Sequence, residues 1–173
     1  MMEEAKKSVI LVGFMGVGKT TAGALAAQQL DRTFVDIDDE IVKAFDMTIP
    51  DIFSAYGEDV FREKERELVE AYCTASNQVI SLGGGVFMND ALRRLCLEHG
   101  LVVHLDMSWE AWTERLDDII DTRPVLQKKN VDEIESLFYE RKDLYKDHHM
   151  KVMTDGLSEE AVAEAIVSAV RTN

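Results

Sequence analysis

Eight consecutive residues constrain the fold of this chain more than any other feature. They read Gly13-Phe14-Met15-Gly16-Val17-Gly18-Lys19-Thr20 and match the GxxxxGK[ST] pattern of a phosphate-binding loop. An apolar run of strand length, Ser8–Val12, precedes them, and an alanine-rich segment with helical spacing, Thr20–Leu30, follows. Glycines in this context let backbone N–H groups surround phosphate oxygens, and the start of the helix adds partial positive charge. The segment therefore predicts binding of a nucleoside triphosphate.

The side chains of this loop predict how the triphosphate is held. Lys19, expected to be an exposed loop residue, would reach the β- and γ-phosphates, and the Thr20 hydroxyl would be a ligand for Mg²⁺. A glycine-rich turn without a ligand is the alternative, and the agreement of strand, loop and helix argues against it. The expected ligands are a nucleoside triphosphate and Mg²⁺, and the expected nucleotide contacts in the loop are Gly16, Val17, Gly18, Lys19, Thr20 and Thr21.

Strand-like and helical segments alternate along the whole chain. Five short runs, mostly rich in Val, Ile or Phe, predict strands at Ser8–Val12, Thr33–Ile37, Gln78–Leu82, Leu101–Leu105 and Lys151–Thr154. Helical spacing and capping residues predict helices at Thr20–Leu30, Glu40–Phe45, Glu58–Ser76, Asn89–Glu98, Trp109–Leu116 and Glu159–Arg171. Such alternation requires right-handed βαβ crossovers, so we expect an α/β fold of three layers in which helices flank a five-stranded parallel sheet.

The length and charge of the chain limit its organisation and its partners. The 173 residues contain no repeat or linker, so residues 1–173 are expected to form one domain, and we expect a monomer. Lys and Arg number 19 against 33 Asp and Glu, and the net charge of −14 disfavours nucleic acid and anionic membranes as partners. Cys73 and Cys96 form no metal or disulfide pattern, and no segment resembles a membrane span or a signal peptide. The expected compartment is therefore the cytoplasm.

Carboxylates follow the second predicted strand at Asp36, Asp38 and Asp39. Alternation along the strand would place Asp36 and Asp38 on the same side of its carboxyl end, which opens toward the phosphates in this type of fold. There they could hold Mg²⁺ and take a proton from an acceptor hydroxyl. The alternative is an acidic cap for the next helix, which suits Asp39 best. Because no NKxD-type guanine-reading motif is present, a small-molecule kinase is favoured over a switch GTPase.

The segment Asp117–Val131 has no clean period and is expected to be a long mobile loop. It is rich in charged residues, which include Arg123. Connections of this length without secondary structure are often lids over active sites, so a lid is favoured over an ordinary surface connection.

Together, these motifs resemble those of the shikimate kinase family in order and approximate spacing. The resemblance implies a P-loop kinase with a mobile lid that transfers a phosphoryl group from ATP to the 3-hydroxyl of shikimate, giving shikimate 3-phosphate on the way to chorismate and the aromatic amino acids. It extends over most of the chain, and the matching pieces are Gly13 to Thr21, Asp36-Ile37-Asp38, Ile52-Phe53, Gly57-Glu58, Phe61-Arg62 with Glu65, Gly83-Gly84-Gly85, Arg123-Pro124, and Arg141 with Leu144-Tyr145.

The same resemblance implies roles for individual residues. Lys19, Asp38 and Arg123 would be catalytic, with Asp38 acting as base or orienting the acceptor hydroxyl. Asp36 would lie near Mg²⁺ together with Thr20. Adenine would stack on Arg115, and Arg123 would reach the transferring phosphate from the lid. The implied contacts to shikimate are Asp38, Arg62, Gly83, Gly84, Gly85 and Arg141.

Chemistry supports the two arginines of this set. A guanidinium is a planar, permanently charged fork that matches a carboxylate. The alternative is that Arg62 and Arg141 form surface ion pairs with acidic neighbours on their own helices. Two other functions also remain open: a related kinase of sugar acids or nucleoside monophosphates, and a non-catalytic nucleotide-binding relative. The second would be expected to have lost Lys19, Asp38 or Arg123, and all three are present.

Overall fold

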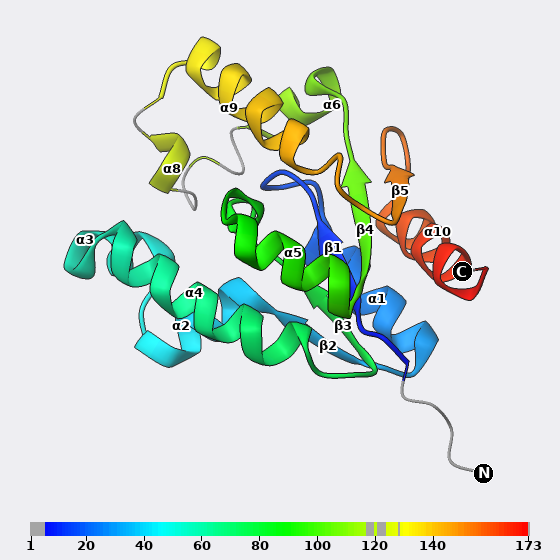
Figure 1. The fold of residues 1–173 in the computed structure, drawn as a ribbon. Helices are drawn as coiled ribbons and strands as arrows, with labels where there is room; N and C mark the ends of the chain where they lie inside the picture. Colours follow the sequence, from blue (N-terminus) through cyan, green and yellow to red (C-terminus); the bar gives the residue numbers. More distant parts are fainter. Residues whose placement is uncertain (1–5, 117–119, 121–123, 128, 173) are drawn as a thin grey trace.

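The protein is described by a computed structural model that covers residues 6–116, 120, 124–127 and 129–172. Five parallel strands form a sheet in the order β2-β3-β1-β4-β5, and helices cover both of its faces (Figure 1). The strands are β1 (Val9–Val12), β2 (Thr33–Asp36), β3 (Gln78–Ser81), β4 (Leu101–Asp106) and β5 (Met150–Met153). The helices are α1 (Lys19–Leu30), α2 (Ile37–Phe45), α3 (Ile49–Tyr56), α4 (Glu58–Cys73), the 3-10 helix η1 (Val86–Met88), α5 (Asp90–His99), α6 (Trp109–Thr113), α8 (Pro124–Gln127), α9 (Val131–Leu144) and α10 (Glu159–Arg171). The predicted α/β fold with a five-stranded parallel sheet is confirmed.

Strand β1, which leads into the predicted nucleotide loop, lies in the middle of the sheet. It pairs with β3 on one side and β4 on the other, so that Val9 lies opposite Val79 and Leu101. All four of its residues are buried. Strands that are covered on both faces read as continuous apolar runs, as this one does. The loop that follows β1 therefore leaves the middle of the sheet.

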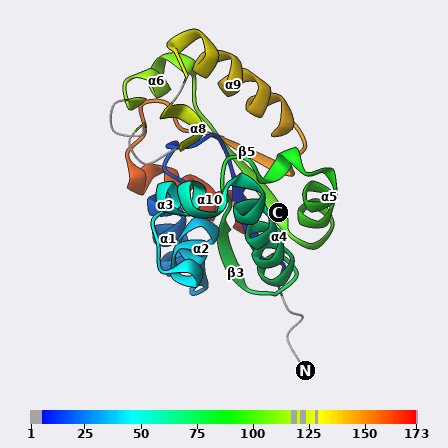
Figure 2. The same ribbon diagram turned by 90° about the vertical axis from the view of Figure 1, so that its left-hand side faces the viewer.

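Two apolar layers, one on each face of the sheet, form the core. On one face, strand residues such as Leu11 pack with α1 and α10, and on the other, strand residues such as Ile10 pack with α4 and α5. Cys73 and Cys96 are buried as free thiols in the second layer. Helices α6, α8 and α9 lie beyond the carboxyl ends of the strands (Figures 1 and 2), where they surround the end of the sheet that carries the loop.

The start of α2 differs from the prediction. β2 ends at Asp36 and α2 begins at Ile37, so Asp38 lies in the first turn of a helix and the argument from strand alternation was wrong. Asp36, not Asp39, is the N-cap: its side chain accepts a hydrogen bond of 3.1 Å from the Asp39 N–H. An aspartate cap satisfies an otherwise unpaired N–H and so starts the helix early.

The expected loop at 117–131 also contains regular structure. Helix α8 occupies four of its residues, and the fully buried Leu126 joins the core there. Helix α9 begins at Val131 behind a capping box formed by Asn130 and Glu133. The prediction of a continuous loop is therefore wrong for α8, because burial of Leu126 stabilises a turn with no sequence period. The lid residue Arg123 lies outside the described residues.

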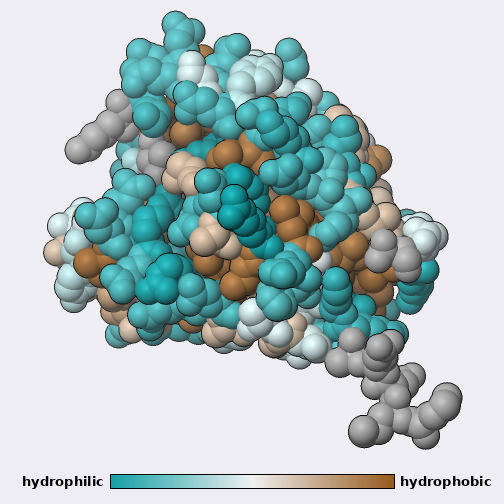
Figure 3. All heavy atoms as spheres, in the orientation of Figure 1, coloured by the Kyte–Doolittle hydropathy of each residue, from teal (hydrophilic) through white to brown (hydrophobic). Residues whose placement is uncertain are grey.

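The surface agrees with the charged composition. The face seen in Figure 3 is mainly hydrophilic, and hydrophobic residues gather near its centre. Charged residues make up 30% of the chain. In the part of the chain that the structure describes, no helix is both long and apolar enough to cross a membrane.

Candidate active site

The predicted nucleotide loop and the predicted carboxylates line one cavity. It has a volume of about 160 Å³ and opens at the carboxyl ends of β1, β2 and β3. Parallel strands bring their carboxyl ends to the same edge of the sheet, so segments far apart in sequence meet there. The residues that line this nucleotide cavity are Met15, Gly16, Gly18, Lys19, Thr20, Thr21, Asp36, Asp38, Ser81, Leu82, Gly83 and Gly84.

The loop is shaped by its glycines and braced from α6. Gly18 has a φ of 92° and forms the N-cap of α1, a left-handed conformation that glycine adopts without strain. The Val17 side chain is buried in the core, and Val17 is not among the residues that line this cavity. Trp112 Nε1 donates a 2.6 Å hydrogen bond to the Met15 carbonyl, and Arg115 Nη1 donates one of 3.0 Å to the Gly16 carbonyl. The position of the loop is thus fixed before any ligand binds.

Lys19 is buried, contrary to the expectation of an exposed loop residue. Only 8% of it is exposed. Its ammonium group donates hydrogen bonds to the carbonyls of Gly13 at 2.8 Å and Phe14 at 3.0 Å. The side chain starts at the first turn of α1 and folds back along the loop, which explains the burial. Its positive charge is therefore held at the loop itself.

Thr20 and Asp36 meet at the mouth of the same cavity. The Thr20 hydroxyl donates a hydrogen bond to Asp36 Oδ2, and Asp36 Oδ1 accepts from the Asp39 N–H. The pKa of Asp39 is raised, first by its own burial and then by repulsion from Asp36 and Asp38. A hydroxyl and a carboxylate in a locally negative setting suit Mg²⁺, which prefers hard oxygen ligands. Among the described residues, no group of three His, Cys, Asp or Glu side chains is placed to hold a metal ion.

A second cavity adjoins the first and contains the predicted acceptor residues. It is narrow and lies between α3, α4, the glycine triplet and α9. Arg62 of α4 and Arg141 of α9 converge on Gly85: a Cβ atom there would lie 2.7 Å from Nη1 of each. Only a residue without a side chain leaves room for both guanidinium groups. The residues that line this acceptor cavity are Met15, Asp38, Ile49, Phe53, Phe61, Arg62, Glu65, Gly83, Gly84, Gly85, Pro124 and Arg141.

The two arginines differ in their partners. Arg62 forms ion pairs with Glu65 at 2.9 Å and Glu58 at 3.4 Å, so it is both paired along its helix and turned to the cavity. Burial alone would lower its pKa, but attraction to these carboxylates outweighs burial and raises the pKa overall. Arg141 instead donates a 3.0 Å hydrogen bond to the Gly84 carbonyl. Its pKa is lowered, mainly by burial and further by repulsion from Arg62. An anionic ligand between the two would relieve that repulsion.

Glu65 is a candidate functional residue to which the sequence analysis assigned no role. It is 3% exposed, and its Oε1 accepts the hydrogen bond from Arg62. Its Oε2 is buried without a hydrogen-bond partner among the described residues. Burial raises its pKa, and Arg62 opposes that rise. Because buried acceptors are normally satisfied, the free oxygen suits a hydroxyl of the acceptor. Its position three residues after Arg62 was the available signal, but it predicted only an ion pair.

Tyr145 is a second candidate functional residue to which the sequence analysis assigned no role. It is fully buried, and its hydroxyl donates a hydrogen bond to the Gly84 carbonyl that also accepts from Arg141. Helix α9 is held against the sheet by an ion pair of 3.3 Å between Lys142 and Asp106. The glycine triplet is thus contacted from the end of α9, a segment to which Arg141 and the matching pair Leu144-Tyr145 had pointed.

Arg115 lies at the far side of the nucleotide loop. It lines a small hollow together with apolar residues from α1 and α10, which include Val162, and with Leu157 from the loop after β5. Thr154, at the end of β5, donates from both its N–H and its hydroxyl to the Asp106 carbonyl at 2.8 Å. These bonds fix the loop that follows β5. The hollow is also lined by Thr154 and Glu159, so Arg115 lies beside both apolar and polar groups.

Comparison with known proteins gives consistent matches along the chain. A family model described as shikimate kinase matches residues 15–171. The shikimate kinase of Bacillus subtilis (strain 168) is 49% identical over 167 residues, which cover 96% of this chain and 90% of that protein. The shikimate kinase of Geobacillus kaustophilus is 46% identical over 168 residues, which cover 96% of this chain and 89% of that protein.

Solved structures agree with these matches. Shikimate kinase from Acinetobacter baumannii, solved in complex with shikimate, has a TM-score of 0.89 at 32% identity and covers 97% of this chain and 94% of that one. A gluconokinase from Sinorhizobium meliloti has a TM-score of 0.60 at 13% identity, which shows a shared fold alone. With a family model over most of its length and relatives near half identical throughout, this chain belongs to the shikimate kinase family.

Proposed function

We propose that this protein is a shikimate kinase, which transfers the γ-phosphoryl group of ATP to the 3-hydroxyl of shikimate. The observation that carries the proposal is the convergence of Arg62 and Arg141 on Gly85, in a cavity that adjoins the nucleotide loop. Two guanidinium forks at one point suit a compact carboxylate. Family membership and the shikimate bound in the Acinetobacter baumannii structure support the same acceptor.

Asp38 and Glu65 are proposed to hold the hydroxyl groups of the acceptor. A Cβ atom at Gly83 would lie 3.0 Å from Asp38 Oδ1 and 3.1 Å from Glu65 Oε2, so both carboxylates border the same glycine. Asp38 also lines the nucleotide cavity, which makes it the carboxylate that borders both spaces. Gly83, Gly84 and Gly85 offer backbone that a ligand can approach closely.

Phosphoryl transfer is proposed to rely on position and charge. The 3-hydroxyl oxygen forms a bond to the γ-phosphorus as the bond to the ADP oxygen breaks, and Asp38 takes or orients the hydroxyl proton. Lys19 neutralises charge on the phosphate oxygens, and Arg123 is proposed to do the same from the lid. Thr20 and Asp36 are the residues that would hold Mg²⁺, which neutralises phosphate charge when bound.

The nucleotide itself is proposed to lie along the loop formed by Gly16, Val17, Gly18 and Thr21. Adenine would stack on the Arg115 guanidinium beside the apolar side chains of Leu157 and Val162. Arg115 Nη1 already lies 3.7 Å from the position of a Cβ atom at Gly18, so base and phosphates would be bound side by side.

The organisation proposed for the protein is one domain, residues 1–173, acting as a cytoplasmic monomer without nucleic-acid or membrane partners. The net charge of −14 supports the absence of polyanionic partners. Two buried free thiols are in keeping with a reducing compartment.

A coupled assay of ADP release tests the function. The acceptors are shikimate, quinate, gluconate and nucleoside monophosphates, each at saturating ATP. We expect turnover with shikimate far above the others, and Arg141→Lys should raise the KM for shikimate more than the KM for ATP because an ammonium cannot reproduce the fork. Turnover with another acceptor alone, or with none, would contradict the proposal.

A further inference from the structure

A large cavity lies at the amino ends of the strands, at the end of the sheet opposite the candidate active site. Its residues come just before β1, β2 and β5, from the start of β4, and from the last turns of α1 and α10. Its volume is about 660 Å³, within the range of roughly 300–1,000 Å³ typical of small-molecule sites. The residues that line this basal cavity are Lys6, Lys7, Leu30, Arg32, Gly100, Leu101, His149, Val170 and Arg171.

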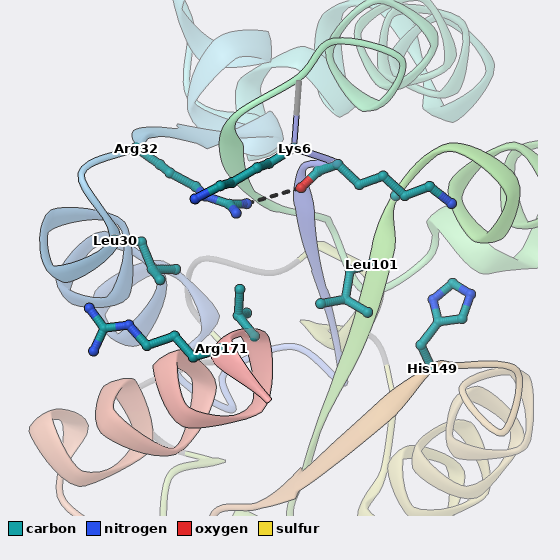
Figure 4. A pocket seen from close by; sticks show the side chains of 9 residues that line it. Lys6, Leu30, Arg32, Leu101, His149 and Arg171 are labelled. Atoms are coloured by element: carbon teal, nitrogen blue, oxygen red, sulfur yellow. Dashed lines mark hydrogen bonds between the residues drawn. The ribbon is translucent and has the colours of Figure 1, made fainter. Parts of the chain in front are cut away.

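The charge of the basal cavity is opposite to that of the chain. Four of its nine residues are Lys or Arg, a fifth is His149, and none of these nine described residues is Asp or Glu. In the whole chain, by contrast, Asp and Glu outnumber Lys and Arg by 33 to 19. In the view of Figure 4, Lys6, Arg32 and Arg171 lie on the side of Leu30, and His149 lies on the far side of Leu101.

Three of the positively charged side chains donate hydrogen bonds to backbone carbonyls. Lys7 Nζ donates to the Glu98 carbonyl at 3.4 Å, Arg32 Nη1 to the Lys7 carbonyl at 3.0 Å, and Arg171 Nη2 to the Gln29 carbonyl at 3.5 Å. Within the described ranges, no ion pair joins any of these three side chains to a carboxylate. Burial lowers the pKa of Arg32, and burial followed by repulsion from Lys7 lowers the pKa of His149. The repulsion from Lys7 at His149 agrees with a local excess of positive charge.

Stabilisation of helix ends accounts for only part of this charge. The carboxyl ends of α1 and α10 border the cavity, and each helix end carries roughly half a negative charge. Together they offset about one of the four positive charges. Among the nine described lining residues, the positive charge therefore exceeds what the two helix ends offset.

The rest of the lining is apolar. Leu101 is buried, and Leu30 and Val170 are half-buried, so aliphatic surface lies between the cations. We propose that the basal cavity binds a small organic anion that carries at least two negative charges, as phosphate or carboxylate, on an apolar body. The lysines and arginines pair with the charged groups, and the aliphatic residues cover the body. The net charge of −14 repels nucleic acid, which leaves a small molecule as the ligand.

An NMR titration tests the site directly. The probe is 1-naphthyl phosphate, added to protein saturated with Mg²⁺ and a non-hydrolysable ATP analogue so that the nucleotide loop is blocked. We expect shifts of the backbone amides of Lys7, Gly100, Leu101 and Val170, with Gly83–Gly85 unchanged. Inorganic phosphate lacks the apolar body and 1-naphthol lacks the charge. Each should bind at least about tenfold more weakly than 1-naphthyl phosphate. Equal binding of either one, or shifts at the glycine triplet alone, would overturn the proposal.

A matched pair of double variants separates local from general charge. Lys6→Gln with Arg171→Gln should weaken binding of the probe about tenfold or more. Lys43→Gln with Lys146→Gln changes the net charge equally at side chains that are 72% and 68% exposed, and should leave binding unchanged. Equal weakening in both variants would overturn the proposal. If the first variant does not fold, the amide shifts of the unsubstituted protein decide the question.

Discussion

Replacing Gly85 with alanine tests whether the two arginines grip the acceptor. Gly85 has φ −106° and ψ −1°, which alanine adopts without left-handed strain. A methyl group there would lie 2.7 Å from Nη1 of both Arg62 and Arg141, whereas ordinary contact begins at 3.4 Å. Both guanidinium groups must therefore retreat by the difference, about 0.7 Å.

A retreat of that size removes a hydrogen bond. It lengthens a charge-assisted bond of about 2.9 Å to about 3.6 Å, which is outside the hydrogen-bonding range. Each hydrogen bond to a charged group contributes about 1.5–3 kcal/mol. Loss of one arginine's hydrogen bond to the carboxylate should therefore weaken shikimate binding roughly 10- to 100-fold. The ends of flexible side chains move at little cost, so the melting temperature should change little.

Steady-state kinetics checks this prediction. With shikimate varied at saturating ATP, the KM for shikimate should rise as calculated, while the KM for ATP changes less than about twofold. Gly84→Ala is the matched comparison, because its methyl group would lie 3.1 Å from Met15 Cγ and should disturb the nucleotide loop instead. An unchanged KM for shikimate in folded Gly85→Ala, or equal losses for both substrates, would refute the reasoning.

Three further substitutions test the carboxylates and the loop. Lys19→Met should abolish turnover and, because Lys19 is buried and bonded to two carbonyls, should also lower the melting temperature; a folded variant with full activity would exclude the assigned role. Asp38→Asn should lower kcat roughly 100-fold, and a fall below about threefold would leave Asp38 as a helix residue only. Glu65 has a pKa raised above its ordinary 4.5, so the stability that it contributes is fully present below pH 4.5 and is lost as pH rises through the folded-state pKa. Melting curves should therefore show the wild type losing stability relative to Glu65→Gln as the pH rises above about 4.5, and a constant difference would contradict the raised pKa.

The sequence predicted those parts of the fold in which local pattern and burial agree. β1 is apolar on both faces and leads into a motif with a fixed conformation, so strand, loop and helix were all predictable. No bounds were predicted for α9, although Asn130 and Glu133 form a readable capping box at its start and the ion-pair alternative already placed Arg141 on a helix. α8 has no such signal, since its turn depends on burial of Leu126 by the rest of the protein.

The site was predictable by residue type and less so by position. The glycine triplet and the two arginines were found through the resemblance to the family, and the absence of a side chain and the planar charged fork gave these assignments a physical reason. The burial of Lys19 follows from its side chain folding back along its own loop, whereas the unpaired oxygen of Glu65 depends on how separate segments meet, which no local pattern encodes. The two roles considered for Arg62, a contact to shikimate and an ion pair on its own helix, do not exclude each other. The side chain is paired with Glu65 on its helix and also lines the acceptor cavity.

Asp106, at the end of β4, connects the two halves of the proposed active site. Its side chain holds Lys142 of α9, the helix that carries Arg141, and its carbonyl accepts both bonds from Thr154, which fix the loop beside the proposed adenine hollow. The acceptor side therefore depends on the Asp106 carboxylate, whereas the nucleotide side depends on its backbone. Because a side-chain substitution leaves the carbonyl in place, a change at this residue acts on α9 and the acceptor site first, and the loop after β5 keeps its anchor.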